Sequence, residues 1–481
     1  MDKMALIGRS EEKKLLKKYY DSPKSEFVAV YGRRRVGKTY LISETLGHLF
    51  DFDFSGLYQT PASIQREEFQ KELNRRGKTN AAAPRNWFDA FDALREYLLS
   101  LKKDKVVVFL DELPWMDTNK SNFRTALASF WNRWGNTTPV LKLYVCGSAT
   151  TWMVDKLIGD KGGLYGRISR PIYLAPFSLN ETKQYLNTVK KMKYGDQQVL
   201  DAYMIFGGIP YYLDMFDSEL PLSVNIDNLL FAENAPLRNE YDFLFRSLFN
   251  DSINYRKVIE LLSKKLEGLT REEILSHSGV SGGELSRILL NLSSCDFIRS
   301  YSAPGKKERS QIYQLTDLFS LFYLRFVKPN PQPDRNYWTN LLNTGKKNAW
   351  SGYAFEQVCL HHIDQIKIKL GIPGISSNIY AWKQEGFTDA DGNEWTGGQI
   401  DLIIDRSDRV INLCEMKYSN DEYSISKQYA GILRNRTSLF RHVEKTKKDL
   451  RITFITTYGV KNNEHSGIVD NEVVLSDLFS K

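Results

Sequence analysis

The sequence predicts an α/β protein whose first part is a doubly wound parallel sheet, and three apolar runs indicate this fold class. Residues 27–31 (FVAVY) precede a glycine-containing loop and a helical pattern. Residues 105–110 (KVVVFL) and 141–146 (LKLYVC) are similar runs that end in polar residues. Such short runs are typical of buried parallel strands. In a doubly wound sheet their carboxyl ends meet at one edge, where the ligand binds.

The loop after the first run fits the phosphate-binding pattern G-x-x-x-x-G-K-[ST] over residues 32–39. Gly32 and Gly37 let the backbone curl so that its N–H groups face phosphate oxygens. Lys38 brings positive charge to the outer phosphates, and Thr39 offers a hydroxyl to Mg²⁺. A glycine-rich turn with a solvated lysine is the alternative, but strand and helix flank the loop as the motif requires. We expect ATP and Mg²⁺ to be bound by Gly32, Arg33, Arg34, Arg35, Val36, Gly37, Lys38, Thr39 and Tyr40.

Two acids follow the second run, at the edge of the sheet where the loop lies. Asp111 is the candidate holder of the Mg²⁺ shell, and Glu112 is the candidate residue that orients or polarises the attacking water. This pairing favours hydrolysis over binding alone. A strand that simply continues into an acidic turn is the alternative.

Polar residues mark the starts of two helices in the same half. Ser10 is the candidate cap of an amphipathic helix over residues 10–20, and Ser178 or Asn180 caps a helix that begins after Phe177. Helices at these places support an alternation of strands and helices around the sheet.

Length and composition indicate a multidomain chain. At 481 residues and 42% hydrophobic content, the chain can form about three packed domains. The net charge of +8 assists an approach to nucleic acid but does not establish a DNA partner. No run approaches the roughly 20 apolar residues that span a bilayer, so we expect no membrane partner and a cytoplasmic protein. Isolation in apolar contexts predicts buried thiols at Cys146, Cys295, Cys359 and Cys414.

The first half resembles the AAA+ superfamily, and more narrowly its STAND-like branch. That resemblance places Ile7-Gly8-Arg9 against the adenine, with Gly8 and Arg9 as nucleotide-binding residues. It makes Ser148 the polar sensor near the γ-phosphate. It also matches residues 208–210 (GIP) to the element that closes a helical lid over the nucleotide, with Pro210 as the binding residue.

Arg167 is the candidate arginine that neutralises charge on the γ-phosphate. Arg170 is its competitor, and a surface arginine or a structural ion pair is the alternative. Such an arginine acts from its own subunit or from a neighbour, so a homo-oligomer, a protein partner and a single chain all stay open.

The pattern changes to short helices and a polar hairpin between about residues 250 and 326. Helical spacing over residues 255–266, a capping box over 270–273 and a helix over 281–292 precede two alternating segments. This order resembles a winged helix-turn-helix with a basic tip. The third helix begins with Ser281-Gly-Gly-Glu, which is poorly suited to reading bases. DNA contact would use Lys306, Lys307 and Arg309, and the alternative is a hinge or scaffold.

Three separated elements near the C-terminus carry acids. Glu356 lies in a helix over residues 353–362, Asp401 in a strand over 399–404, and Glu415 in a strand over 410–417 that ends at Lys417. An antiparallel strand pair would bring the acids together as ligands for Mg²⁺ or Mn²⁺. Lys417 would then stabilise the charge of a pentavalent phosphate.

These elements resemble the PD-(D/E)xK nuclease superfamily at Glu356, Asp401, Glu415 and Lys417. Gln428 matches a further polar helix position of some members, whereas Ile400 replaces the usual proline. The alternative is a nuclease-like fold that binds DNA or a protein without cutting. His361 and His362 are expected to be ordinary helix residues rather than metal ligands.

The predicted division assigns residues 1–240 to an ATPase with a helical lid and 241–326 to a winged helix. Residues 327–345 form a linker, because three prolines in 327–335 (VKPNPQPDR) forbid a regular helix, and 346–481 form the nuclease-like domain. Our leading hypothesis is an ATP-hydrolysing switch that controls a nuclease-like domain acting on or binding DNA. A regulatory or signalling ATPase that uses the C-terminal part only for recognition is the alternative.

Overall fold

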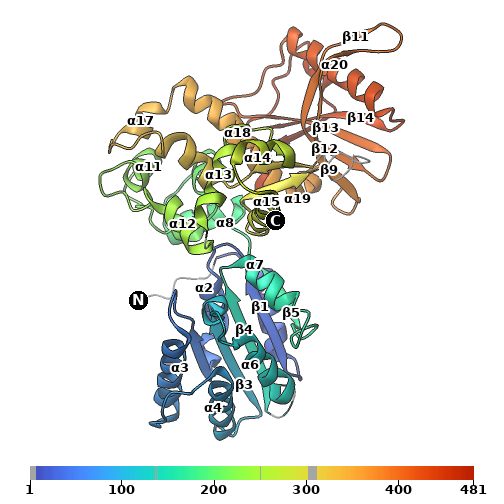
Figure 1. Ribbon diagram of the computed structural model, residues 1–481. Coiled ribbons are helices and arrows are strands. Elements are labelled where there is room, and N and C mark those ends of the chain that lie inside the picture. The colour runs from blue at the N-terminus through green and yellow to red at the C-terminus, as the bar shows by residue number, and fades with distance from the viewer. Residues whose placement is uncertain (1–6, 136, 138, 250, 302–310, 481) are drawn as a thin grey trace. The chain divides into compact units, whose positions relative to one another are not determined.

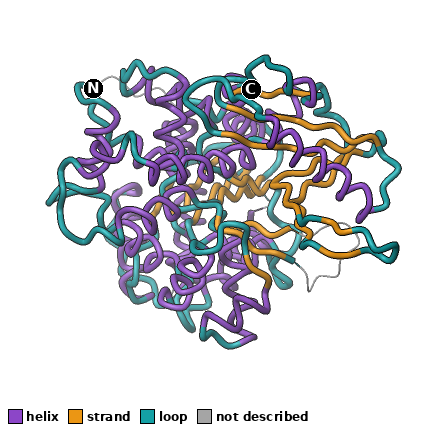
Figure 2. Tube along the Cα trace, turned by 90° about the horizontal axis from the view of Figure 1, so that it is seen from above, coloured by secondary structure: helices purple, strands orange, loops and turns teal. Residues whose placement is uncertain are grey.

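The computed structural model describes residues 7–135, 137, 139–249, 251–301 and 311–480. The chain divides into two compact units, Met1–Pro176 and Phe177–Lys481. Figure 1 labels their helices and strands, and Figure 2 follows helices and strands along the Cα trace. The four-part division expected above remains an interpretation of segments within these two units.

The first unit is built on a five-stranded sheet. The strand order is β2-β3-β4-β1-β5, and every neighbouring pair is parallel. The strand β1 lies between β4 and β5, and the loop after β1 leaves at the carboxyl ends of these parallel strands. The predicted α/β fold with a parallel sheet is confirmed. The strands are β1 (Glu26–Tyr31), β2 (Phe52–Ser55), β3 (Lys105–Asp111), β4 (Val140–Gly147) and β5 (Arg170–Tyr173).

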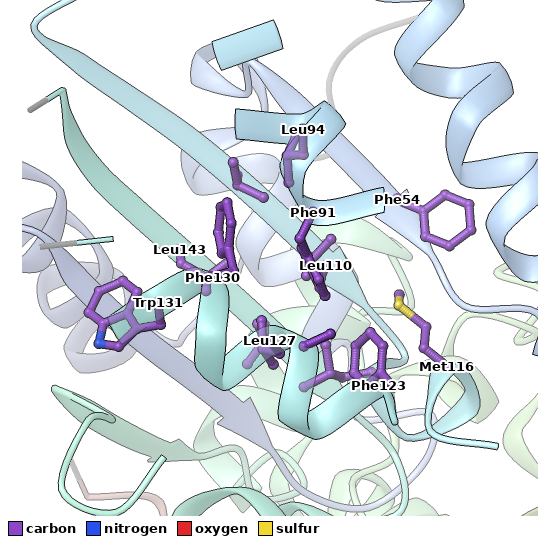
Figure 3. Packing of buried hydrophobic residues seen from close by; sticks show 14 of the residues in the cluster. Phe54, Phe91, Leu94, Leu110, Met116, Phe123, Leu127, Phe130, Trp131 and Leu143 are labelled. Carbon is purple, nitrogen blue, oxygen red and sulfur yellow. The ribbon is translucent and has the colours of Figure 1, made fainter. Parts of the chain in front are cut away.

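Helices cover both faces of this sheet. On one face α1 and α2 pack, and Tyr144 Oη of β4 donates a hydrogen bond to Leu16 O of α1 at 3.1 Å. On the other face α3, α4 and α6 enclose an apolar core, and Figure 3 shows Phe91, Leu110 and Leu127 converging there. The helices are α1 (Ser10–Asp21), α2 (Lys38–Leu46), α3 (Ala62–Gly77), α4 (Trp87–Ser100), α5 (Leu113–Met116), α6 (Phe123–Phe130) and α7 (Thr150–Trp152).

The start of α1 differs from the prediction. Ser10 is the first helical residue, and Arg9, with φ 54°, holds the N-cap position without a side-chain cap. The expected Ser10 cap is therefore wrong. By contrast, Ser178 caps the first helix of the second unit in a capping box with Glu181, as expected.

The second unit begins with a group of helices. A glycine pair with positive φ, Gly207 at 64° and Gly208 at 66°, ends α9 and leads into α10, which starts at Pro210. Gly208 has no room for a side chain, because a Cβ there would lie 2.3 Å from Phe177 O. The helices are α8 (Leu179–Gln184), α9 (Asp196–Phe206), α10 (Pro210–Leu213), α11 (Leu222–Leu230) and α12 (Glu240–Leu248).

Residues 252–315 follow the expected order of helices and paired strands. The strands form a small antiparallel sheet in the order β6-β8-β7. Thr270 and Glu273 form the predicted capping box. The predicted tip with Lys306, Lys307 and Arg309 lies outside the described residues. The elements are α13 (Ser252–Leu262), β6 (Leu269–Thr270), α14 (Arg271–Ser278), α15 (Gly282–Ser294), β7 (Ile298–Tyr301) and β8 (Ile312–Leu315).

The proline-containing segment is more ordered than a linker. After α16 (Leu318–Phe322) and a π-helical turn over Tyr323–Val327, residues 328–336 contain no regular helix, as expected. The helix α17 (Tyr337–Leu341) then packs against α11. An apolar residue in α17, Trp338, packs edge-on against Phe322, which explains why this part of the predicted linker is folded.

A second, mixed sheet forms the C-terminal part. Its order is β15-β14-β13-β12-β9, with β9, β12 and β13 antiparallel and β13, β14 and β15 parallel. The predicted strand pair is confirmed as β12 and β13. The remaining elements are α18 (Gly345–His361), α19 (Ile363–Lys369), β9 (Ser377–Gln384), β10 (Phe387–Thr388), β11 (Glu394–Trp395), β12 (Gly398–Arg406), β13 (Val410–Lys417), α20 (Lys427–Glu444), β14 (Asp449–Thr456) and β15 (Asn471–Val474).

Candidate functional site

The loop between β1 and α2 is curled as the phosphate-binding pattern predicts. Gly32 has a φ of 145° and Gly37 a φ of 89°, and Arg35 between them is also left-handed at 73°. A Cβ on Gly32 would lie 2.3 Å from Leu174 O, so the backbone passes β5 too closely for any side chain. Glycine is therefore required here both by conformation and by space.

Lys38 lies inside this curl. Its Nζ donates hydrogen bonds to Gly32 O and Arg33 O, each at 3.0 Å, and the residue is buried. Since these acceptors are backbone atoms of the loop itself, the ammonium group is held within the loop, where a bound phosphate would meet it. Of the other predicted loop residues, Arg33 and Val36 are buried, Arg34 is half-buried and Tyr40 is exposed.

The predicted magnesium residues meet across the sheet edge. Thr39 Oγ1 donates to the Asp111 carboxylate, 3.1 Å from both oxygens, and Ser55 Oγ is 3.4 Å from Oδ2. Cys146 also contacts this carboxylate, and burial followed by the Asp111 charge raises the pKa of its thiol well above the ordinary value. Sequence reasoning did not find the Ser55 and Cys146 contacts, because the adjacency of β2, β3 and β4 creates them.

Glu112 and Ser148 are hydrogen-bonded to each other at the carboxyl edge of the sheet. The Glu112 carboxylate accepts hydrogen bonds from Ser148 N at 3.0 Å and from Ser148 Oγ at 2.9 Å. Glu112 also has a left-handed backbone, with φ 45°, at the turn from β3 into α5. The end of β4 therefore fixes the direction of the acid that was predicted to orient water.

The other predicted residues of this unit lie in different surroundings. Arg9 is buried and donates through Nη2 to Ala175 O at 2.6 Å, and the same atom is 3.5 Å from Val36 O of the loop; Gly8 precedes it with φ 64°. Arg167 and Arg170 are exposed.

The residues around the loop fit ATP with Mg²⁺. The evidence is the cradle at Gly32 that a Cβ would fill, the enclosed Lys38 ammonium group and the Thr39–Asp111 pair of oxygen donors. Thr39 and Asp111 would hold Mg²⁺, which would supply positive charge against the phosphates. Pro210 belongs to the second unit, where it begins α10.

The candidate C-terminal residues come together in one place. A cavity of about 450 Å³ is lined by Glu356 of α18, Asp401 of β12, and Glu415 and Lys417 of β13. The β12–β13 register explains this, since Asp401 and Glu415 each stand one residue beyond the Leu402–Cys414 pair. We call this the acid cavity.

Burial shifts the pKa values of the ionisable side chains in this cavity. Burial, followed by the neighbouring Asp401 charge, raises the pKa of Glu356 to about 8. Burial also raises the pKa of Asp401, although Gln399 Nε2 donates to its Oδ1 at 2.8 Å. Burial alone would lower the pKa of Lys417, but the charge of Glu415 together with the contributions of Tyr429 and Tyr423 outweighs it, and the net change is upward.

Glu415 is the most enclosed acid of the cavity, with its side chain 5% exposed. Its Oε1 accepts from Arg436 Nη1 at 2.6 Å, and its Oε2 accepts from Tyr429 Oη at 2.6 Å. Lys417 Nζ is 3.3 Å from the same Oε2. Two cations and a hydroxyl therefore surround this carboxylate.

This arrangement does not fit the predicted Mg²⁺ or Mn²⁺ site of Glu356, Asp401 and Glu415. Among the described residues, no group of three or more His, Cys, Asp or Glu side chains is placed to hold a metal ion. The physical reason is that both oxygens of Glu415 already have partners, two of which are positively charged side chains.

The acid cavity has polar residues that sequence reasoning missed. Arg299 of β7 lines it and donates through Nε to Gln314 Oε1 at 2.9 Å. Gln357 is fully buried at the cavity, and within the described part of the chain neither atom of its amide has a hydrogen-bond partner. Helical spacing offered a signal for Arg436, which lies seven residues after Tyr429 on α20.

Three expectations about nearby polar residues have clear outcomes. Gln428 is exposed and lines a neighbouring cavity of about 620 Å³ rather than the acid cavity. His362 is a structural residue, because its Nε2 accepts from Leu179 N at 3.0 Å and its Nδ1 lies 2.8 Å from Val358 O. Burial lowers the pKa of His362 to about 4. His361 is the last residue of α18.

Other expectations concern the chain as a whole. All four cysteines are free and buried, as predicted. Within the described residues, no helix has the length and apolar character needed to cross a membrane.

The parallel sheet, the curled loop and the acid edge together define a nucleoside-triphosphate-binding domain of the phosphate-loop class. More particularly, residues 6–216 match the family model described as "ATPase domain predominantly from Archaea". This match covers less than half of the chain, and it extends from the first unit into the beginning of the second.

Comparisons with whole proteins extend beyond this domain. The chain is 25% identical over 439 residues to an uncharacterized protein of Methanocaldococcus jannaschii, covering 89% of this chain and 91% of that protein. It is similar to the Walker-type ATPase of Pyrococcus abyssi, at 20% identity and a TM-score of 0.49, over 66% of this chain and 96% of that one. It is also similar to the ORC2 protein of Aeropyrum pernix, solved as ADPNP–ADP complexes, at 14% identity and a TM-score of 0.41, over 68% of this chain and 94% of that one.

Proposed function

We propose that this protein is an ATP-hydrolysing switch whose nucleotide state controls the C-terminal domain, and that this domain binds or acts on DNA. The observation that carries the ATPase part is the enclosed Lys38 beside the Thr39–Asp111 pair. The acid cavity carries the DNA part, because the four residues that resemble a nuclease motif line one space.

In the first unit the residues divide the work of hydrolysis. The curled loop and Lys38 bind the phosphate tail, and Thr39 with Asp111 would hold Mg²⁺. Glu112, aimed by its two hydrogen bonds from Ser148, would orient the attacking water. Arg167 is exposed and is proposed to neutralise charge that develops on the γ-phosphate.

Nucleotide-binding assays test the first part of the proposal. Lys38→Ala should weaken ATP binding by about 100-fold or more, because the loop loses the charge that meets the outer phosphates. Isothermal titration calorimetry measures this. Lys17→Ala, which removes a positive charge from an exposed position of α1, is the control and should retain the affinity. Unchanged affinity in Lys38→Ala would refute the assignment.

Hydrolysis is tested separately from binding. Glu112→Gln should retain ATP affinity and lower the rate of phosphate release by about 100-fold, since only the water-orienting carboxylate is lost. An unaltered rate would remove Glu112 from the mechanism without affecting the binding assignment.

In the second unit two versions of the DNA function compete. If the domain cuts, Lys417 stabilises charge on the reacting phosphate, and Glu356, Asp401 and Glu415 assist it. The contacts of Glu415 favour the second version, in which the domain recognises DNA without cutting it.

Plasmid and oligonucleotide assays separate these versions. Cleavage with Mn²⁺ that is lost in Glu415→Ala and in Lys417→Ala, with ATPase activity intact, would establish the nuclease. Salt-dependent retention of DNA without strand breakage would establish recognition. If the protein neither cleaves nor retains DNA, with or without ATP, DNA is excluded as the partner.

A further inference from the structure

We propose that Arg436 acts as a built-in cation of the acid cavity and keeps divalent metal ions away from Glu415. This deepens the proposed function, on whose acid cavity it rests, by stating how that cavity is regulated. Arg436 is a positioning residue in this proposal, because it acts through Glu415.

The first support is the geometry around Glu415. Arg436 Nη1 lies 2.6 Å from Oε1, in a charge-assisted hydrogen bond, and Tyr429 Oη lies 2.6 Å from Oε2. Glu415 is 5% exposed, whereas Arg436 is 25% exposed. The buried acid is thus fixed, and the guanidinium enters from the more open side.

The second support is the origin of the two contacts. Tyr429 and Arg436 stand seven residues apart on α20, so they share one helix face. Buried Leu433 lies between them in the sequence and packs that face against the neighbouring core. The helix thereby holds a hydroxyl and a guanidinium on the same carboxylate, and neither depends on a flexible loop.

The third support is charge. Lys417 Nζ is 3.3 Å from Glu415 Oε2, so Glu415 already faces two cations. A divalent ion at this carboxylate would meet strong repulsion from both, because unit charges about 4 Å apart interact by several kcal/mol near a protein surface. Removal of the Arg436 charge should therefore admit a metal ion, while Lys417 stays in place.

The test is titration of nucleotide-free protein with Mn²⁺, followed by calorimetry. We expect no metal binding in the wild type that depends on Glu415, and a gain in Mn²⁺ affinity of about tenfold or more in Arg436→Gln. Arg434→Gln removes the same charge from an exposed position of α20 and should behave as the wild type. Arg436→Lys retains a cation and should also bind Mn²⁺ no better than the wild type.

Two further variants assign the outcome to the cavity. Adding Glu415→Gln to Arg436→Gln should abolish the gained binding, which distinguishes this cavity from the phosphate loop. If wild-type protein binds Mn²⁺ and Glu415→Gln alone removes that binding, the proposal is overturned. It is also overturned if folded Arg436→Gln gains no affinity. Should Arg436→Gln not fold, Arg436→Met, which also removes the charge, replaces it in the same titration.

These outcomes do not depend on DNA or on ATP hydrolysis. Failure of metal exclusion would leave the switch intact, because ATPase and DNA-retention assays measure that separately. Conversely, loss of the DNA function would leave the metal titrations meaningful for the cavity itself.

Discussion

At the scale of single residues, Gly32 shows how a backbone constraint becomes a functional one. Its φ is 145°, and a Cβ at this position would lie 2.3 Å from Leu174 O. Position 32 therefore has no room for any residue type with a side chain. We expect Gly32→Ala to lower the free energy of unfolding by about 2–4 kcal/mol and to abolish ATP binding, because the loop must move away from β5.

Urea unfolding and ATP titration check this prediction. Gly47→Ala is the control in the same unit, since a Cβ there meets only ordinary contacts of 3.8 and 3.9 Å. We expect it to change stability by less than about 0.5 kcal/mol. A Gly32→Ala protein with native stability and native ATP affinity would contradict the constraint.

Glu356 gives a pH-dependent prediction. Its pKa is raised from 4.5 to about 8 by burial and then by Asp401. Between these two values the unfolded chain has lost the proton that the folded chain retains, so this residue makes the wild type less stable as pH rises. Glu356→Gln cannot ionise, so it removes this loss of stability at high pH. The variant should exceed the wild type in free energy of unfolding by about 1–3 kcal/mol near pH 8 and by little near pH 4.

Denaturant unfolding across this pH range measures the difference. Glu267→Gln, at another acid of the same cavity, serves as the comparison. A constant difference between Glu356→Gln and wild type at all pH values would show that Glu356 is not buried as described.

At the scale of elements, local motifs were easier to predict than contacts between elements. Lys38 and Thr39 follow from a contiguous pattern, and Asp111 from the end of an apolar strand, so adjacency in sequence sufficed. Arg436 was missed, because its meeting with Glu415 depends on how α20 packs against β13. Likewise, a predicted strand pair was enough to place the acids Asp401 and Glu415 together. It was not enough to predict that a positively charged side chain of α20 pairs with Glu415.

The segment around α17 shows the same limit. Its prolines correctly excluded a helix over residues 328–336, but they did not reveal that residues 337–341 form a helix. The missing information was the partner: Asp227 of α11 accepts hydrogen bonds from Trp338 N at 2.7 Å and from Thr339 N at 3.1 Å. Thr339 Oγ1 also donates to Asp227, at 2.6 Å. A buried acid far away in the sequence thus caps the start of α17.

Asp227→Ala should therefore destabilise the second unit by about 2–3 kcal/mol, since it leaves two buried N–H groups without an acceptor. Thermal unfolding followed by circular dichroism measures the loss. Asn228→Ala, at the exposed neighbouring position of α11, should change stability by less than about 0.5 kcal/mol. Equal melting of the two variants would mean that α17 does not depend on this cap.

At the scale of the whole molecule, the proposed switch needs a physical connection from the helices α8 and α9, in the segment predicted to form a lid, to the acid cavity. Within the second unit, Tyr418 follows the cavity residue Lys417 directly. Its Oη donates to Asp201 Oδ1 of α9 at 3.0 Å and accepts from Gln197 Nε2 of α9 at 2.8 Å. The same α9 ends at the glycine pair that leads into Pro210.

A second contact joins the same parts of this unit. His362, at the end of the helix that carries Glu356, accepts a hydrogen bond from Leu179 N at the start of α8. Two of the elements that supply residues to the acid cavity, α18 and β13, are therefore followed directly by a residue that is hydrogen-bonded to α8 or α9. A shift of α8 and α9 would act on both walls of the cavity.

Tyr418→Phe should consequently uncouple the cavity from the nucleotide state without removing either activity. The phenyl ring keeps the packing against Phe355, but the hydroxyl that joins α9 to β13 is lost, at a cost of about 1–2 kcal/mol. We expect normal ATP hydrolysis and normal DNA retention without nucleotide. The ratio of DNA affinities with and without a non-hydrolysable ATP analogue should fall to about one.

Tyr458→Phe, which removes a hydroxyl from a more exposed tyrosine, is the matched control and should respond to the analogue as the wild type does. The measurement is DNA binding by fluorescence anisotropy at fixed salt, because retention of DNA varies steeply with ionic strength. A wild-type protein whose DNA affinity ignores the analogue would remove the switch itself. A wild type that responds, together with a Tyr418→Phe variant that responds equally, would instead show that the nucleotide state acts on the cavity by a route other than Asp201 and Tyr418.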